Sequence, residues 1–245
     1  MAKRVITLLI LGVAAMVSAF AATTSVPDCQ GVTMDQLIGA TPLYTGCTVQ
    51  DKLFTNFSWS AAAVAASSVS LIDDIDPGYP GGSPVVVGLG LSGPFGVLAG
   101  GTAIDINLSY TVTVTNPNYL IDDATLFLSG VAFHGGTGSL TGSEDWCAGA
   151  NVHTGCVGGQ MQHADILYSA AVNDPTYHVL FSPGTTFVTV TKDIQVNPDP
   201  TVPTDFSRLD QSYSQTLSGP EPVSMILFGS GLTLVGLVGR KLRKS

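Results

Sequence analysis

Cysteine and histidine are the residues whose spacing in this 245-residue sequence first suggests a chemical role. Cys147, His153, Cys156 and His163 would bring two thiolates and two imidazoles together, yet their separations of six, three and seven residues match no common zinc site. An even number of cysteines is typical of disulfides in an oxidising compartment. The four cysteines allow three connectivities, and proximity along the chain favours two short loops. The favoured pairs are Cys29–Cys47 and Cys147–Cys156.

A cluster of aspartates makes calcium the candidate cofactor. Asp73, Asp74 and Asp76 precede Pro77-Gly78 and would offer hard oxygen ligands within a turn. The segment departs from the EF-hand loop, because Gly78 and Val85 stand where that loop needs ligands. We therefore favour a solvated acidic turn, with calcium as the alternative.

No motif in the sequence assembles a catalytic site. Glu144-Asp145 would suit a glycosidase, but adjacent strand residues point to opposite faces, and that chemistry needs two carboxyl groups facing one sugar. The G-x-S-x-G motif of a serine hydrolase is absent. Gly88–Gly93 matches G-x-G-x-x-G, but Pro94 follows at once, so we interpret these residues as glycines of a β loop. We expect no enzymatic activity.

Aromatic side chains offer a different chemistry, stacking on sugar rings. The four candidates are Trp59, Tyr79, Tyr119 and Trp146. Trp59 falls in the apolar row of a predicted strand and is expected in the core, whereas Trp146 stands beside a cysteine and two acids. We therefore expect Trp146 to be the better exposed of the two tryptophans.

The elements that would position these residues are strands. Ala103 to Thr115 is the clearest strand, because apolar residues from Ile104 to Val114 alternate strictly with polar ones. Phe187 to Val196 places Val188, Val190, Ile194 and Val196 on one face. Leu53, Thr55, Phe57 and Trp59 alternate in the same way. Further strand candidates are 124–133, 164–172, 176–181 and 205–217. Gly and Pro turns separate these runs, and no segment between 22 and 219 has a convincing helical period, which predicts an all-β sandwich of jelly-roll type.

Charge limits the partners of this predicted domain, residues 22–219. It carries three Lys or Arg against 17 Asp or Glu. Such a surface repels phosphate backbones and anionic headgroups, which argues against nucleic-acid partners.

The N-terminal segment, residues 1–21, has the features of a signal peptide. Lys3 and Arg4 precede an apolar run, and Ala19-Phe20-Ala21 gives the small-x-small pattern that signal peptidase needs. We expect this segment to form a short helix that is removed during export.

The C-terminal segment, residues 220–245, has three parts. Pro220-Glu221-Pro222 comes first, and the uncharged run Val223–Gly239 is just long enough to cross a bilayer as a helix. A basic stop follows, formed by Arg240, Lys241, Arg243 and Lys244. Because basic residues stay on the cytoplasmic side, this order places the preceding domain outside the inner membrane.

This order closely resembles the PEP-CTERM sorting signal of exported bacterial proteins. Gly46 to Phe57, Asp122-Asp123, the segment from Cys147 to Cys156, and Val188 to Ile194 also resemble one group of these proteins, whose β-rich exported domain has no assigned activity. The resemblance implies an exosortase as the partner that handles the tail. It implies no catalytic residues.

The sequence therefore predicts a non-enzymatic protein of the cell envelope or extracellular matrix, associated with exopolysaccharide or biofilm. A carbohydrate-binding module is the alternative, and a secreted hydrolase ranks third.

Overall fold

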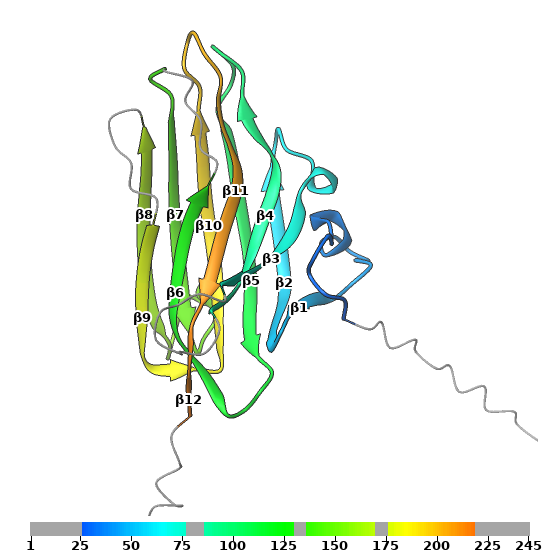
Figure 1. Cartoon of the computed structure of the whole chain (residues 1–245), viewed down its shortest axis with the longest axis vertical. Coiled ribbons are helices and arrows are strands. Elements are labelled where there is room, and N and C mark those ends of the chain that lie inside the picture. The colour runs from blue at the N-terminus through cyan, green and yellow to red at the C-terminus, as the bar shows by residue number, and fades with distance from the viewer. Residues whose placement is uncertain (1–25, 77–85, 130–135, 170–175, 219–245) are drawn as a thin grey trace, which may run out of the picture.

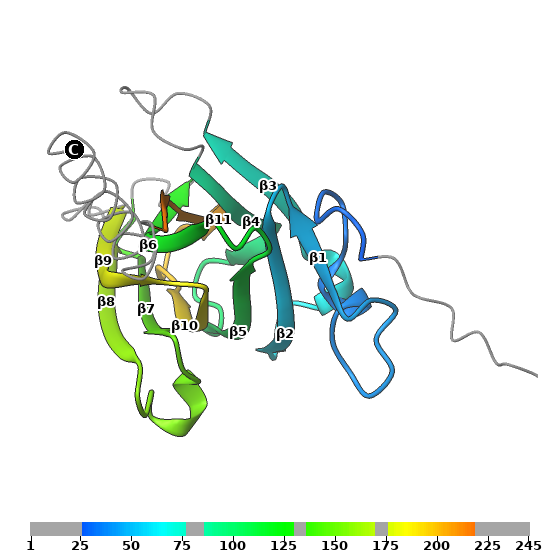
Figure 2. The same cartoon turned by 90° about the horizontal axis from the view of Figure 1, so that it is seen from below.

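Two antiparallel sheets packed face to face make up the computed structural model, which describes residues 26–76, 86–129, 136–169 and 176–218 (Figures 1 and 2). Sheet A has the order β1 (Gly46–Val49), β2 (Lys52–Ala61), β5 (Ile104–Val114), β10 (Phe187–Asn197), β7 (Ser139–Ala148), β8 (Gln160–Ser169). Sheet B has the order β9 (Thr176–Thr185), β6 (Tyr119–Ser129), β11 (Thr204–Tyr213), β4 (Val86–Val97), β3 (Ser70–Asp76). The prediction of an all-β sandwich is confirmed.

Strand β12 (Gln215–Leu217) continues β11 after Ser214 and pairs with the same neighbour, β6. Three short 3₁₀ helices complete the described elements: η1 (Met34–Gln36), η2 (Ala66–Ser68) and η3 (Val152–Thr154). Within the described residues, no helix is both long and apolar enough to cross a membrane. The signal segment, Pro220-Glu221-Pro222, the apolar run after it and the basic stop lie outside these residues.

The core lies between the two sheets and follows the predicted alternation in the central strands. In β5, Ile104, Ile106, Leu108 and Tyr110 are buried, and the intervening Asp105 and Asn107 are exposed. The Tyr110 and Tyr213 hydroxyls meet across the sandwich at 2.9 Å.

In β2 the predicted alternation is wrong for its first half. Asn56 has a φ of 56° and forms a bulge at which the register with β5 shifts. One extra residue reverses the faces, so Phe54 and Lys52 point inward in place of Leu53. After the bulge, Phe57 is buried and Trp59 packs partly buried against the core, as expected.

Two segments expected as turn or loop are strands. Asp73 to Asp76 belong to β3, and Gly88 to Gly93 lie within β4. Strand β7, which the sequence patterns did not indicate, pairs with both β10 and β8.

Both predicted disulfides are present. Cys29–Cys47 joins the N-terminal segment to β1, and Cys147–Cys156 closes the loop after β7, with Cα atoms 4.9 and 5.6 Å apart. Disulfides of this kind are typical of proteins in oxidising compartments outside the cytoplasm.

Candidate functional site

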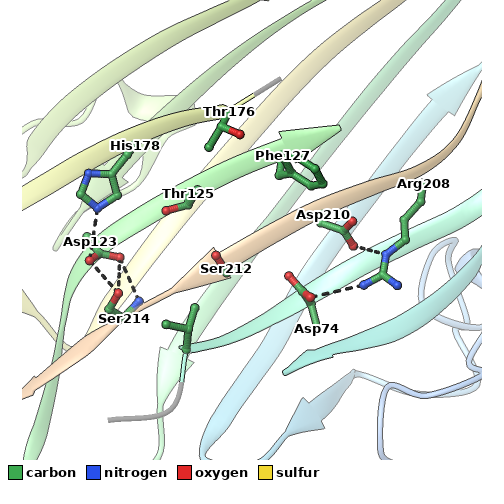
Figure 3. Close-up of a pocket in the computed structure, with 11 residues that line it drawn as sticks. Asp74, Asp123, Thr125, Phe127, Thr176, His178, Arg208, Asp210, Ser212 and Ser214 are labelled. Carbon is green, nitrogen blue, oxygen red and sulfur yellow. Dashed lines mark hydrogen bonds and ion pairs between the residues drawn. The ribbon is translucent and has the colours of Figure 1, made fainter. Parts of the chain in front are cut away.

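A groove of about 510 Å³ runs across the outer face of sheet B. Strands β3, β4, β6, β9 and β11 all contribute to it, and Figure 3 shows its side chains. Strand alternation selects these residues, because those between them face the core. In β6 the groove receives Asp123, Thr125 and Phe127, while Ala124 and Leu126 are buried.

Two glycines of β4 allow the groove to be hollow. Gly88 and Gly90 pair with Ser212 and Asp210 of β11, on the outer face of the sheet. A Cβ at position 90 would lie 2.6 Å from Asp210 Oδ1 and from Ile72 Cγ1, and one at position 88 would lie 2.0 Å from the Gln211 carbonyl oxygen. The Gly-x-Gly of the sequence thus makes room beside β11.

One end of the groove holds an arginine between two carboxylates. Arg208 Nε donates to Asp210 Oδ1, and its Nη2 donates to Asp74 Oδ1 at 3.3 Å. The Arg208 side chain is 37% exposed, so the guanidinium is both oriented and accessible. Asp74 comes from β3, so this cluster spans both strands adjacent to β4.

The other end of the groove holds a carboxylate that binds a serine and a histidine. Asp123 accepts from the Ser214 amide at 3.0 Å and from the Ser214 hydroxyl at 2.6 Å, and His178 Nε2 lies 3.3 Å from Asp123 Oδ2. In a Ser-His-Asp hydrolase the histidine stands between the other two. Here the aspartate does, so the serine hydroxyl donates to a carboxylate and is not activated as a nucleophile.

Between the two ends lies Phe127, whose side chain is 39% exposed. The hydroxyl side chains of Thr125, Thr176 and Ser212 also line the groove (Figure 3). The site therefore combines an accessible aromatic ring with donors and acceptors that point to one side of a sheet.

Of the aromatic residues singled out in the sequence, the three that the structure describes do not line this groove. Trp146 is fully buried between the sheets, so its predicted exposure is wrong. It follows Leu140, Gly142 and Glu144 on the inward face of β7, and position in that row outweighs the polarity of its sequence neighbours. Trp59 Nε1 donates to the Val64 carbonyl at 3.4 Å, and Tyr119 is partly buried. Tyr79 lies outside the described residues.

Two of the calcium candidates, Asp73 and Asp74, do not converge on one site. Asp73 and Asp74 are neighbours in β3 and point to opposite faces, so they cannot bind one ion as residues of a turn would. Burial and the nearby Asp28 raise the pKa of Asp73 to about 6, while Asp74 pairs with Arg208. Asp76 is the last residue of β3. No group of three or more His, Cys, Asp or Glu within the described ranges is arranged to hold a metal.

The remaining sequence candidates are also separated. Glu144 is buried and Asp145 is half exposed on the opposite face, which confirms that they cannot act as one pair. Cys147 and Cys156 are bonded to each other, so neither is a thiolate available to zinc.

The groove residues carried little signal in the sequence. Arg208 is the sole arginine between residues 22 and 219, but its rarity alone does not indicate a functional site. Asp123 was noted as part of a resemblance, and Phe127 as part of an apolar run. These residues lie in one sheet because β6 pairs with β11, β11 with β4, and β4 with β3. No local sequence pattern encodes these pairings.

Searches of family models and of curated proteins find no match to this chain. Among solved structures, similarity is found to TmCBM61 in complex with β-1,4-galactotriose, with a TM-score of 0.30, 8% identity, and coverage of 66% of this chain and 88% of that one. A structure of carbohydrate-binding modules from the β-sandwich superfamily has a TM-score of 0.26 and 6% identity, and the match covers 78% of this chain and 61% of that one. The enzymatically active domain of bacteriophage CBA120 tailspike protein 4 has a TM-score of 0.26 and 13% identity, and the match covers 76% of this chain and 24% of that one. These TM-scores are too low to assign a shared fold or function.

Proposed function

We propose that this chain is an exported β-sandwich protein that binds an extracellular polysaccharide in the groove on sheet B. The observation that carries the proposal is the combination of an exposed Phe127 with oriented polar groups at both ends of one groove. Sugars present hydroxyl groups at their edges and C–H groups on their faces. A ring flanked by charged donors and acceptors meets both needs.

The charges of the groove favour a neutral glycan. Three aspartates, Asp74, Asp123 and Asp210, face one arginine and one histidine. This excess of negative charge, within a strongly acidic domain, disfavours uronic-acid or sulfated polymers. Binding without chemistry is part of the proposal, and the position of Asp123 between Ser214 and His178 supports it.

The scaffold also fits a binding role. Strands β4 to β11 cross from one sheet to the other at every step except β7 to β8, and form the orders β4-β11-β6-β9 and β5-β10-β7-β8. We infer a jelly roll from this order, an architecture that lectin domains use. A matrix or surface component associated with exopolysaccharide is the setting that the sequence predicts for such a protein.

A glycan array probed with the purified protein, with and without calcium, tests this function. We expect binding to neutral oligosaccharides, and Phe127→Ala should weaken it about tenfold. Leu167→Ala is the matched control, because Leu167 is 41% exposed on the outer face of sheet A. Absence of binding to any glycan, or equal loss in both variants, would contradict the proposal.

We further propose that an exosortase processes the segment that begins at Pro220-Glu221-Pro222, after signal peptidase has removed residues 1–21. The proposal rests on the order of the three sequence features alone. Deleting the exosortase gene should leave a full-length precursor in the inner membrane. An unchanged mature protein in that strain would refute it.

A further inference from the structure

Three polar side chains meet in the core between the two sheets, on the opposite side of sheet B from the groove. Lys192 of β10 and Glu144 of β7 are cross-strand partners in sheet A, and Gln211 of β11 faces them from sheet B. Lys192 Nζ contacts Glu144 Oε2 and lies 2.5 Å from Gln211 Oε1. All three are buried, with exposures of 4%, 1% and 1%.

This cluster is incompletely satisfied as an ordinary ion pair. Glu144 Oε1 is buried and has no hydrogen-bond partner among the described residues. Trp146 Nε1 also makes no hydrogen bond of normal geometry among the described residues, and its interaction with Glu144 lowers the pKa of that carboxyl by the smallest of the contributing effects. A buried carboxylate with one unpaired oxygen is costly, so the ionic form is poorly favoured here.

The surroundings favour neutral forms of both partners. Burial raises the pKa of Glu144 to about 7 despite the nearby lysine, and burial lowers the pKa of Lys192. Leu89, Leu91, Leu108 and Leu209 surround Lys192 and Gln211, and the space left between them does not admit a water-sized sphere. An uncharged lysine is a nucleophile, and a dry site protects it from competing hydrolysis.

The geometry also places an electrophile within reach. A carbonyl bond is about 1.23 Å long, so a nitrogen 2.5 Å from Gln211 Oε1 is at most about 3.7 Å from Gln211 Cδ. This upper limit is slightly longer than the roughly 3–3.5 Å of a near-attack arrangement, so Nζ must turn from its hydrogen bond with Oε1 toward Cδ before it attacks. The Gln211 amide is oriented by its own Nε2, which donates to the Thr125 carbonyl at 3.0 Å.

We propose that Lys192 and Gln211 become joined by an amide bond between Nζ and Cδ, with Glu144 as the proton-transfer group. Lys192 first gives a proton to Glu144 and becomes an amine. Nζ then attacks Cδ, the Cδ–Nε2 bond breaks, and the second proton lost by Nζ leaves with Nε2 as ammonia. Glu144 keeps the first proton and no longer faces a cation, so atoms and charges balance without any oxidant.

A second buried lysine provides an internal comparison. Lys52 is 0% exposed and donates to Gln215 Oε1 at 3.1 Å, but its neighbouring acid, Asp51, is 24% exposed at a distance of 3.4 Å. The acid there stays in contact with solvent and lies farther from the amine. We therefore expect no bond at Lys52.

Tryptic mapping of the secreted protein tests the bond, because between residues 22 and 219 trypsin can cut only after Lys52, Lys192 and Arg208. If the bond forms, cleavage after Lys192 is blocked. The peptide 53–208 then stays attached to the peptide that begins at Leu209, with a loss of about 17 Da for ammonia. Cleavage after Lys52 should remain complete.

Glu144→Gln is the matched variant, because it preserves the shape of the side chain and removes the acid. We expect its digest to contain free peptide 193–208 and an unlinked peptide beginning at Leu209. Free peptides from the wild-type protein would overturn the proposal, whether or not the variant folds. A loss of about 18 Da with Lys192 joined to Glu144, or full linkage in the variant, would also overturn it.

Discussion

Lys192 and Arg208 each donate hydrogen bonds to two side chains, yet their side chains lie on opposite sides of sheet B. Lys192 is 4% exposed and faces Glu144 and Gln211 between the sheets. Arg208 contacts Asp74 and Asp210 on the outer face, where 37% of its side chain is exposed. One strand, β11, supplies both Gln211 and Asp210 as consecutive residues.

The difference shows that moving one position along a strand, from the outer to the inner face, changes the role of a charged side chain. Water screens the Arg208 cluster, so it costs little to maintain and remains free to meet a ligand. The Lys192 cluster has lost its hydration, so its protonation states and partners are tightly linked to folding. The same types of side chain thus serve binding outside and constrain the core inside.

Removing the buried lysine should have the largest effect on stability. Lys192→Ala leaves Glu144 without its partner, removes packing and removes the proposed bond to Gln211, which together should lower the free energy of unfolding by about 3–5 kcal/mol or more. Urea denaturation followed by tryptophan fluorescence measures this, because Trp146 is buried next to Glu144.

A double replacement checks that the cost comes from the broken pair. Lys192→Met combined with Glu144→Leu replaces the pair by apolar side chains and should be more stable than Lys192→Ala. Both variants lack the proposed bond to Gln211, so comparing them isolates the unpaired acid. A double variant as unstable as Lys192→Ala would mean that the loss comes from the absent lysine and its bond, and not from an unpaired Glu144.

Removing the outer cation should have a smaller effect. Arg208→Ala should cost about 1–1.5 kcal/mol, because Asp210 loses a contact while water reaches Asp74. The same urea titration gives the value. A loss as large as that of Lys192→Ala would show that the groove is as dry as the core.

The smallest effect should come from Asp73, the inward neighbour of Asp74. Its folded-state pKa of about 6 exceeds the ordinary 3.8, so between these values the native state binds more protons than the unfolded state. Its contribution to stability therefore falls as pH rises from about 4 to 6, by about 0.5–1 kcal/mol after screening by solvent.

Asp73→Asn should remove this component of the pH dependence and leave the protein slightly more stable than wild type at pH 7. Urea titrations at several pH values between 4 and 7 measure it, with the exposed Asp35→Asn as control. Identical pH profiles for wild type and Asp73→Asn would contradict the raised pKa.

The sequence foretold the central strands because their alternation is local. The strand predicted over Ala103 to Thr115 is β5, one residue shorter at each end. In β10 the apolar row Val188, Val190, Ile194 and Val196 has a gap, and Lys192 fills it. A lysine in the inward register of a strand was therefore a readable signal of the buried cluster, although its partners were not.

Features that depend on pairing between distant strands could not be foretold. The bulge at Asn56 reversed the faces of Lys52 and Leu53, because one residue with positive φ shifts the register of β2. The groove requires Asp74, Arg208 and Asp123 to face the same side of one sheet from strands far apart in sequence. The glycines that open it looked like loop residues because their partners in β3 and β11 were unknown.

The continuity of β11 and β12 has a mechanical consequence. The last described strand segments run along β6, and Ser214 between them is held by hydrogen bonds to Asp123. Hydrogen bonds in antiparallel pairs run perpendicular to the strands, so a pull from the C-terminal end would load many of them at once in shear. Such a domain should resist stretching from that end far better than one whose final strand peels away bond by bond.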